Sequence, residues 1–161
     1  MSQAEAIESF GVPKREWTRR FGSFNVQVAQ HFRDVSETQK AFAQSGIPSD
    51  DGGYRWNVYA FIFPQHPLFA EFDQKSDSFG QKVCVSLPFH YGPSYLRRHF
   101  NENGEVSCYQ VGSDYNHLHD ERFTRMAEPI DAARVFLDAA DLIEALTRAF
   151  MEGQRSDKHD S

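Results

Sequence analysis

The sequence predicts an α+β fold, a mostly antiparallel sheet with a long C-terminal helix packed on it. Several short stretches alternate apolar and polar residues, as half-buried strands do, and one long stretch near the C-terminus repeats apolar residues at helical spacing. A chain of 161 residues is the size of one domain and can bury a core without metal or disulfide staples. Its 15 Phe, 6 Tyr and 2 Trp supply a heavy aromatic load for that core.

Three elements are expected in the first third of the chain. Residues 2–10 are predicted to form a short helix. The stretch "FNVQVAQHF", residues 24–32, alternates apolar and polar side chains, which indicates a half-buried strand. Ser36 suits the N-cap of a helix that ends near Gln44, because a glycine and a proline follow it.

The middle of the chain is predicted to hold two strands. "YRWNVYAFIF", residues 54–63, is dense in aromatic and β-branched residues, as expected of a central strand. A helical turn is expected over 68–73, and "VCVSLPFH", residues 83–90, is predicted to be a strand. Cys84 and Cys108 fall in predicted strands without metal-type spacing, so we expect buried thiols rather than a disulfide.

The last third of the chain contains the clearest signals. "SYLRRHF", "NENG" and "EVSCYQVG" predict a β-hairpin whose turn uses Asn103-Gly104. A helix is expected from Pro129, suited to a first helical position, to Gly153, suited to the residue past a helix end. The folded domain is therefore expected to span 1–153, and the polar segment 154–161 to be a disordered tail. The predicted apolar stripe of the helix consists of Phe136, Ala140, Ile143, Leu146 and Phe150.

Charge and motif content exclude several classes of function. The net charge of −6 argues against non-specific nucleic-acid binding, and the basic run Lys14, Arg15, Arg19 and Arg20 is expected to be a solvated face. We expect no membrane span and a cytoplasmic location, because neither a secretory signal nor an apolar run of about 20 residues is visible. No Walker loop, dinucleotide fingerprint, zinc-finger spacing or nucleophile elbow occurs.

The stretch "GSDYNHLHD", residues 112–120, is the main candidate for a site. Asp114, His117 and Asp120 are spaced so that their side chains can converge, whether the segment is helical or irregular. A carboxylate bonded to one ring nitrogen fixes the tautomer of the other, as general-base catalysis and metal binding both require. We expect His117, rather than His119, to face a pocket.

A structural interpretation of the same stretch stays open. Asp114 would make a turn bond to the backbone, His117 would be a half-buried packing residue, and Asp120 would cap a helix that begins near Glu121.

Two further histidines stand where predicted strands end. His66 lies between prolines in "FPQHPLF", and His90 lies beside Gly92, which would let a ligand or a neighbouring chain approach closely. If these strand exits meet at one edge of the sheet, His66, His90, His117 and Asp120 are candidate ligands for a divalent metal, zinc or manganese.

Three stretches together resemble a family of proteins from phages and other mobile elements that has no established activity. These are "NVYAFIFPQHPLF", "FHYGPSY" and "VGSDYNHLHD", within residues 55–122. The family has a His-Pro-aromatic loop, a His-Gly-Gly stretch and a Gly-Phe-Asp-x-x-His-x-x-Asp motif, and Tyr91 and Ser113 depart from it. The resemblance implies a shared fold and polar site rather than a reaction. It places the motif on His66, Pro67, His90, Gly92, Gly112, Asp114, His117 and Asp120.

Three functions compete. The first is an enzyme that uses Asp114, His117, Asp120, His66 and His90 for hydrolysis or acid–base chemistry on a small polar or phosphorylated ligand. The second is a non-enzymatic acidic protein that inhibits a host defence complex, as anti-CRISPR proteins do, by binding a host protein. The third is a structural or regulatory module that forms a homodimer. The acidic contact surface of the second would be Asp131, Asp138, Asp141 and Glu144 on the terminal helix.

Overall fold

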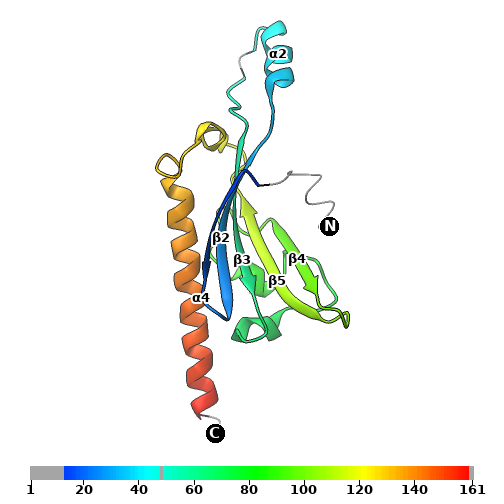
Figure 1. Cartoon of the computed structure of the whole chain (residues 1–161), viewed down its shortest axis with the longest axis vertical. Coiled ribbons are helices and arrows are strands. Elements are labelled where there is room, and N and C mark those ends of the chain that lie inside the picture. The colour runs from blue at the N-terminus through cyan, green and yellow to red at the C-terminus, as the bar shows by residue number, and fades with distance from the viewer. Residues whose placement is uncertain (1–12, 48, 160–161) are drawn as a thin grey trace.

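The chain folds into a five-stranded antiparallel sheet with one long helix lying along it (Figure 1). The structure, a computed structural model, describes residues 13–47 and 49–159. The strands are β1 (Arg15–Arg20), β2 (Phe24–Phe32), β3 (Tyr54–Ile62), β4 (Tyr95–Phe100) and β5 (Val106–Asp114), in the sheet order β1-β2-β3-β5-β4. The helices are α2 (Ser36–Gln44), η1 (Pro67–Glu71), α3 (Lys82–Val85), η2 (Glu121–Arg125) and α4 (Ala133–His159). The predicted α+β class is confirmed.

The central strands form as their side-chain patterns predict. In β2 the alternate residues Val26 and Val28 are buried, and they pair in register with Ala60 and Val58 of β3. These residues belong to the core between the sheet and α4. The predicted hairpin is also confirmed, with β4 and β5 antiparallel and Gly104 at a φ of 77° in its turn.

Strand β1 was not predicted, because its basic residues were interpreted as a solvated face. Residues Arg15–Arg20 form an edge strand that pairs with residues 25–30 of β2. Trp17 anchors it: its ring stacks on Trp56 with the centroids 5.8 Å apart and meets the edge of Phe136 in α4 at 5.2 Å. One large aromatic residue within a charged segment therefore fixes the strand on the core.

The predicted strand over 83–90 is wrong. Residues Lys82–Val85 form the helical turn α3, and the chain beyond it is irregular up to His90. The buried residues Val83, Cys84 and Leu87 follow helical spacing, and Pro88 has no N–H to contribute to a sheet. Cys84 and Cys108 are free and buried, as predicted, and burial raises the pKa of the Cys108 thiol to about 12.

Helix α4 differs from its prediction at both ends. It begins at Ala133 because residues 129–132 form a turn in which Ala132 N–H donates to the carbonyl of Glu128. It continues past Gly153 to His159, into the segment expected to be a tail. Gly153 therefore does not end the helix, and the glycine has another role. A Cβ at this position would lie 2.2 Å from Cγ of Pro67. The absence of a side chain at Gly153 allows α4 to pack closely on Pro67, the first residue of η1.

The buried face of α4 includes Leu146, as predicted, but its other residues each lie one position before the predicted stripe. Phe136 and Ile143 are only partly buried beside the core, and Ala140 is exposed. Small and medium residues spaced three or four apart bring the helix closer to the sheet than aromatic side chains would. The residues of α4 that face the core are Val135, Ala139, Leu142 and Leu146, and the buried Ala132 lies directly before the helix.

Helix α2 projects away from the sheet, at the top of Figure 1, and buries none of its residues. Ser36 is its first residue and not its N-cap; Val35 takes the cap position, without a side-chain bond. The carboxylate of Asp34 accepts the Ser36 N–H at 3.0 Å instead.

The helix predicted for residues 2–10 lies outside the described residues. Within the part of the chain that the structure describes, no helix is both long and apolar enough to cross a membrane.

Candidate metal centre

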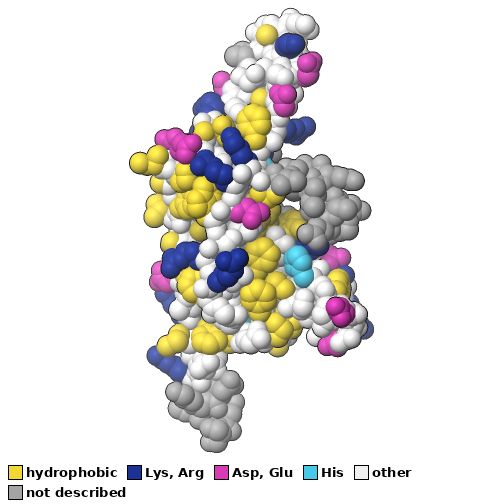
Figure 2. Space-filling model, in the orientation of Figure 1, with side chains coloured by type: hydrophobic (Ala, Val, Ile, Leu, Met, Phe, Trp, Pro, Cys, Tyr) yellow, Lys and Arg dark blue, Asp and Glu magenta, His cyan; other side chains and the backbone are white. Residues whose placement is uncertain are grey.

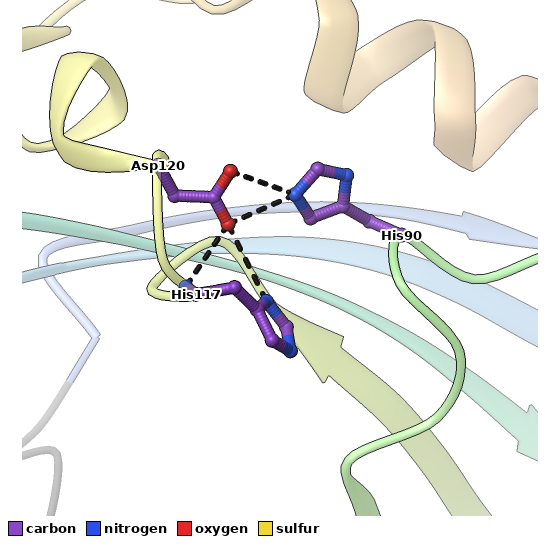
Figure 3. A group of neighbouring side chains, drawn as sticks. All are labelled: His90, His117 and Asp120. Atoms are coloured by element: carbon purple, nitrogen blue, oxygen red, sulfur yellow. Dashed lines mark hydrogen bonds and ion pairs between the residues drawn. The ribbon is translucent and has the colours of Figure 1, made fainter.

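Two loops bring His90, His117 and Asp120 together (Figure 3). His90 belongs to the irregular segment after α3, whereas His117 and Asp120 lie between β5 and η2. Nε2 of His90 is 3.0 and 2.9 Å from the two carboxylate oxygens of Asp120. One nitrogen from each histidine and one oxygen of Asp120 all lie within 4.8 Å of one another.

A tight turn aims the Asp120 carboxylate at the histidines. The Asp120 N–H donates to the His117 carbonyl at 3.0 Å, and the His117 N–H donates to Oδ2 of Asp120 at the same distance. Asp120 precedes η2, but its side chain makes no capping bond to that helix. Asp120 therefore takes the N-cap position before Glu121, as the structural interpretation expected, but its carboxylate does not serve as a cap. Its carboxylate is buried, at 3% exposure, and its bonds all point into the site.

Asp114 lies at the edge of this group, at the end of β5. Its Oδ1 accepts the Asn116 N–H at 3.0 Å, which is the turn bond expected of it, and its Oδ2 accepts the Ser94 hydroxyl at 3.0 Å. Oδ1 is also 3.5 Å from Nδ1 of His117. Asp114 and Asp120 thus both lie close to the same ring nitrogen.

Nδ1 of His117 is the least satisfied atom of the site. It is buried and makes no hydrogen bond, although it lies 3.4 Å from Asp120 and 3.5 Å from Asp114. A buried polar atom without a partner is rare and calls for an explanation such as a bound ion. A ring nitrogen between two carboxylates is where a cation would be stabilised.

The residues fit a divalent transition metal. Ligands about 2.1 Å from a tetrahedral ion are about 3.4 Å apart, which matches the separation of Nδ1 of His117 from Asp120. Two imidazoles and one carboxylate suit zinc, and manganese accepts the same donor types. Three protein ligands leave a position open, as catalytic rather than structural metal sites do.

Helix α4 supports the ring of His90 through Tyr115. The two rings are stacked, with centroids 4.2 Å apart and planes at 10°. The Tyr115 hydroxyl donates to the carboxylate of Asp138, and burial raises the pKa of Tyr115, so the phenol stays neutral. Asp138, expected to belong to an acidic contact surface on the terminal helix, is instead half-buried. Sequence reasoning missed both residues; the position of Tyr115 inside the motif was the available signal.

Two residues with left-handed backbone flank the site. Tyr91 has a φ of 55° and His119 a φ of 75°, values that cost a non-glycine residue free energy and often mark functional sites. The exposed ring of Tyr91 lies 5.2 Å from that of His117. Gly92 has a φ of 83°, and a Cβ there would meet nothing within 4 Å. The positive φ is the reason for a glycine that the structure shows, and the close approach of a ligand or chain stays a prediction.

His66 is not part of the group. It is 2% exposed; its Nε2 donates to the Leu146 carbonyl in α4 at 2.9 Å, and its Nδ1 accepts the Leu68 N–H at 3.1 Å. The expected convergence of three histidines therefore holds for His90 and His117 only. His119 is exposed, and it does not offer a ligand atom to the group.

Antiparallel pairing explains why His66 lies elsewhere. His66 follows the end of β3, where Ile62 pairs with Tyr109, whereas the site follows the end of β5, where Asp114 pairs with Asn57. These pairs are five residues apart along β3, or about 17 Å at strand spacing. In Figure 1 the chain leaves β3 at the lower end of the sheet and leaves β5 at the upper end.

His66 is expected to make folding sensitive to acid. Burial lowers its pKa, and protonating Nδ1 would oppose the bond from Leu68 N–H. The unfolded chain takes up this proton near pH 6.5 and the folded chain resists it, so the stabilisation is complete above about pH 6.5 and declines as pH falls below that value. Urea unfolding at pH 7.5 and 5.5 should show a smaller pH effect in His66→Leu than in wild type. Equal pH effects in the two proteins would contradict this role.

Each histidine of the group lines a cavity of its own. His90 lines one of about 260 Å³ together with Arg122 and Arg134. His117 lines one of about 320 Å³ together with Asp51 and Glu121. Volumes near 300 Å³ suit small ligands. A small polar molecule can therefore reach either ring.

No model of a known protein family, no curated protein and no solved structure matches this chain. The resemblance to mobile-element proteins stays a prediction. The chemistry of the site therefore follows from its own geometry.

Proposed function

We propose that His90, His117 and Asp120 bind one divalent ion, zinc or manganese, and that the protein is a metal-assisted hydrolase of a small polar or phosphorylated substrate. The observation that carries this proposal is Nδ1 of His117, buried and without a hydrogen bond, 3.4 Å from Asp120. Nε2 of His90 points at the same carboxylate from the opposite loop (Figure 3).

A bound divalent metal lowers the pKa of its water to near 7 and so supplies a nucleophile at neutral pH. Asp120 holds both histidines toward one point, and Tyr115 fixes the plane of the His90 ring. Asp114 is placed to accept the proton of the nucleophile, because its carboxylate lies 3.5 Å from the same nitrogen of His117. The Ser94 hydroxyl donates to Asp114 and orients it.

The alternative of an acidic binding surface receives less support from α4. Of the four carboxylates expected to form it, Asp138 accepts a bond from Tyr115, and Glu144 is paired with Arg148 at 2.9 Å. On the face displayed in Figure 2, basic side chains occur among the acidic ones rather than apart from them. Asp131 and Asp141 alone are a small contact for a basic partner.

Metal binding and hydrolysis can be tested with a matched pair of variants. His117→Asn removes a proposed ligand, whereas His119→Asn changes an exposed histidine two positions away, where asparagine tolerates the positive φ. We expect zinc to bind His117→Asn at least about tenfold more weakly than wild type in isothermal titration, since even loss of an outer partner of a ligand costs about 10–100-fold. His119→Asn should match wild type.

Hydrolysis is measured with 4-nitrophenyl phosphate and 4-nitrophenyl acetate after addition of one equivalent of zinc or manganese. We expect metal-dependent turnover in wild type and His119→Asn and its loss in His117→Asn. Equal zinc affinity in the two variants would contradict the metal site, and equal turnover would contradict the hydrolase.

A further inference from the structure

The cavity beside His90 has an unusual concentration of charge. It lies between the loop that carries His90, helix η2 and the first turns of α4, and it is open to solvent. Two arginines line it, Arg122 from η2 and Arg134 from α4. Asp138 and Asp141 also line it, one turn apart on α4.

His90 offers the cavity a nitrogen that the metal centre does not use. Nε2 faces Asp120, and the second ring nitrogen, Nδ1, points away from that carboxylate (Figure 3). Among the residues that the structure describes, none forms a hydrogen bond to Nδ1 of His90. A neutral imidazole that holds a metal through one nitrogen carries its proton on the other, and that N–H normally donates to an oxygen anion. Here the protein leaves that position to the cavity.

The two arginines are available to a ligand. The guanidinium of Arg122 lies over the ring of buried Phe123, 4.6 Å from its centroid, and no described residue pairs with it. Arg134 is 3.6 Å from the Asp138 carboxylate, a loose contact that a stronger acceptor can replace. Asp138 is already bonded by the Tyr115 hydroxyl. Asp141 is the only exposed carboxylate among the lining residues.

We propose that this cavity binds an oxyanion of the substrate, a phosphate or a carboxylate group, through Arg122, Arg134 and the Nδ1–H of His90. This inference rests on the proposed metal site in one respect, because it is the metal on Nε2 that fixes the proton on Nδ1. The metal and the anion then bind opposite nitrogens of one ring. Each strengthens the binding of the other by the same factor, as thermodynamic linkage requires.

Sulfate and acetate serve as probes, because they mimic the two groups and do not precipitate zinc. Each is titrated at constant ionic strength, and the ring resonances of His90 are followed by NMR. In the metal-free protein we expect both anions to bind saturably, and we expect this binding to depend on Arg122 and Arg134. Arg122→Gln and Arg134→Gln should each weaken it at least about fivefold, the loss of one charge-assisted hydrogen bond. Arg148→Gln, which changes an arginine of α4 that does not line the cavity, should leave it unchanged.

Asp141→Asn separates an anion site from a site for a cation or a zwitterion. Removing this carboxylate should strengthen sulfate and acetate binding about twofold, because it removes a like charge. If the cavity instead binds a cationic group, Asp141→Asn would lower its affinity for that group. Preference for sulfate indicates a phosphate group in the substrate, and preference for acetate indicates a carboxylate.

Zinc titrations with and without saturating sulfate test the linkage. We expect zinc affinity to rise at least about threefold with sulfate in wild type but not in the Arg122→Gln/Arg134→Gln double variant. If sulfate did not change the zinc affinity, and neither anion shifted the ring resonances of His90, the anion site would be overturned. The proposed metal site would not be affected by that result. If wild type bound the anions but did not bind zinc, the proposed function would be overturned and the anion site would not.

Discussion

Replacing Asp120 with asparagine is expected to abolish most of the metal affinity and to destabilise the fold. The buried carboxylate is the common acceptor of the His90 ring and the His117 N–H, and it is a proposed ligand. Asparagine keeps the shape but loses the charge and one acceptor. We expect zinc affinity to fall at least about 100-fold and the free energy of unfolding to fall by about 2 kcal/mol, measured by titration calorimetry and urea denaturation.

The control is Glu121→Gln, which removes a carboxylate from the next residue. Glu121 is exposed, and its side chain has no partner among the described residues. This variant should keep both the metal affinity and the stability of wild type. If Asp120→Asn bound zinc as tightly as Glu121→Gln, Asp120 would not be a ligand.

Gly52→Ala is expected to cost about 3 kcal/mol of stability. A Cβ at this position would lie 2.4 Å from the carbonyl oxygen of Thr124 and 2.9 Å from Cα of Arg125. Both are backbone atoms of η2, so a side-chain rotation cannot relieve the clash. The Gly52 N–H also donates to the Thr124 hydroxyl at 3.0 Å. Overpacking of this kind typically costs about 1–3 kcal/mol, and a clash with backbone lies at the upper end.

The same substitution should weaken the metal site, because η2 begins directly after Asp120. Gly80→Ala is the matched control: its φ is ordinary, and its Cβ would meet only the Ser78 hydroxyl at 3.4 Å. Urea denaturation of the two variants decides the point. Equal stability of Gly52→Ala and Gly80→Ala would show that the loop before β3 does not need to pack on η2.

The fold could be predicted where the side-chain pattern was local. The central strands and the hairpin follow directly from alternation and from the Asn103-Gly104 turn. Strand β1 could not be predicted, because the partner that fixes Trp17 is Trp56, far away in the sequence. The rotated face of α4 has the same origin. Ala139 rather than Ala140 is buried against the sheet because of the distance at which the helix packs. That distance cannot be deduced from the sequence.

In the candidate site, too, the local arrangement could be predicted and the contacts between distant segments could not. Asp114, His117 and Asp120 lie within one turn, so their spacing alone brought them together. His66 was grouped with them because it follows a strand, but strand exits meet at one edge only when the strands run parallel. Arg122 and Arg134 were missed because they meet His90 only through the packing of η2 and α4.

Anomalous diffraction from crystals grown with zinc tests the central claim most directly. One strong peak per chain is expected, bonded to Nε2 of His90, Nδ1 of His117 and a carboxylate oxygen of Asp120 at about 2.0–2.2 Å. His90 and Asp120 would then no longer be hydrogen-bonded to each other. A map without a peak there, with Nε2 of His90 still 2.9 Å from Asp120 at saturating zinc, would contradict the metal centre.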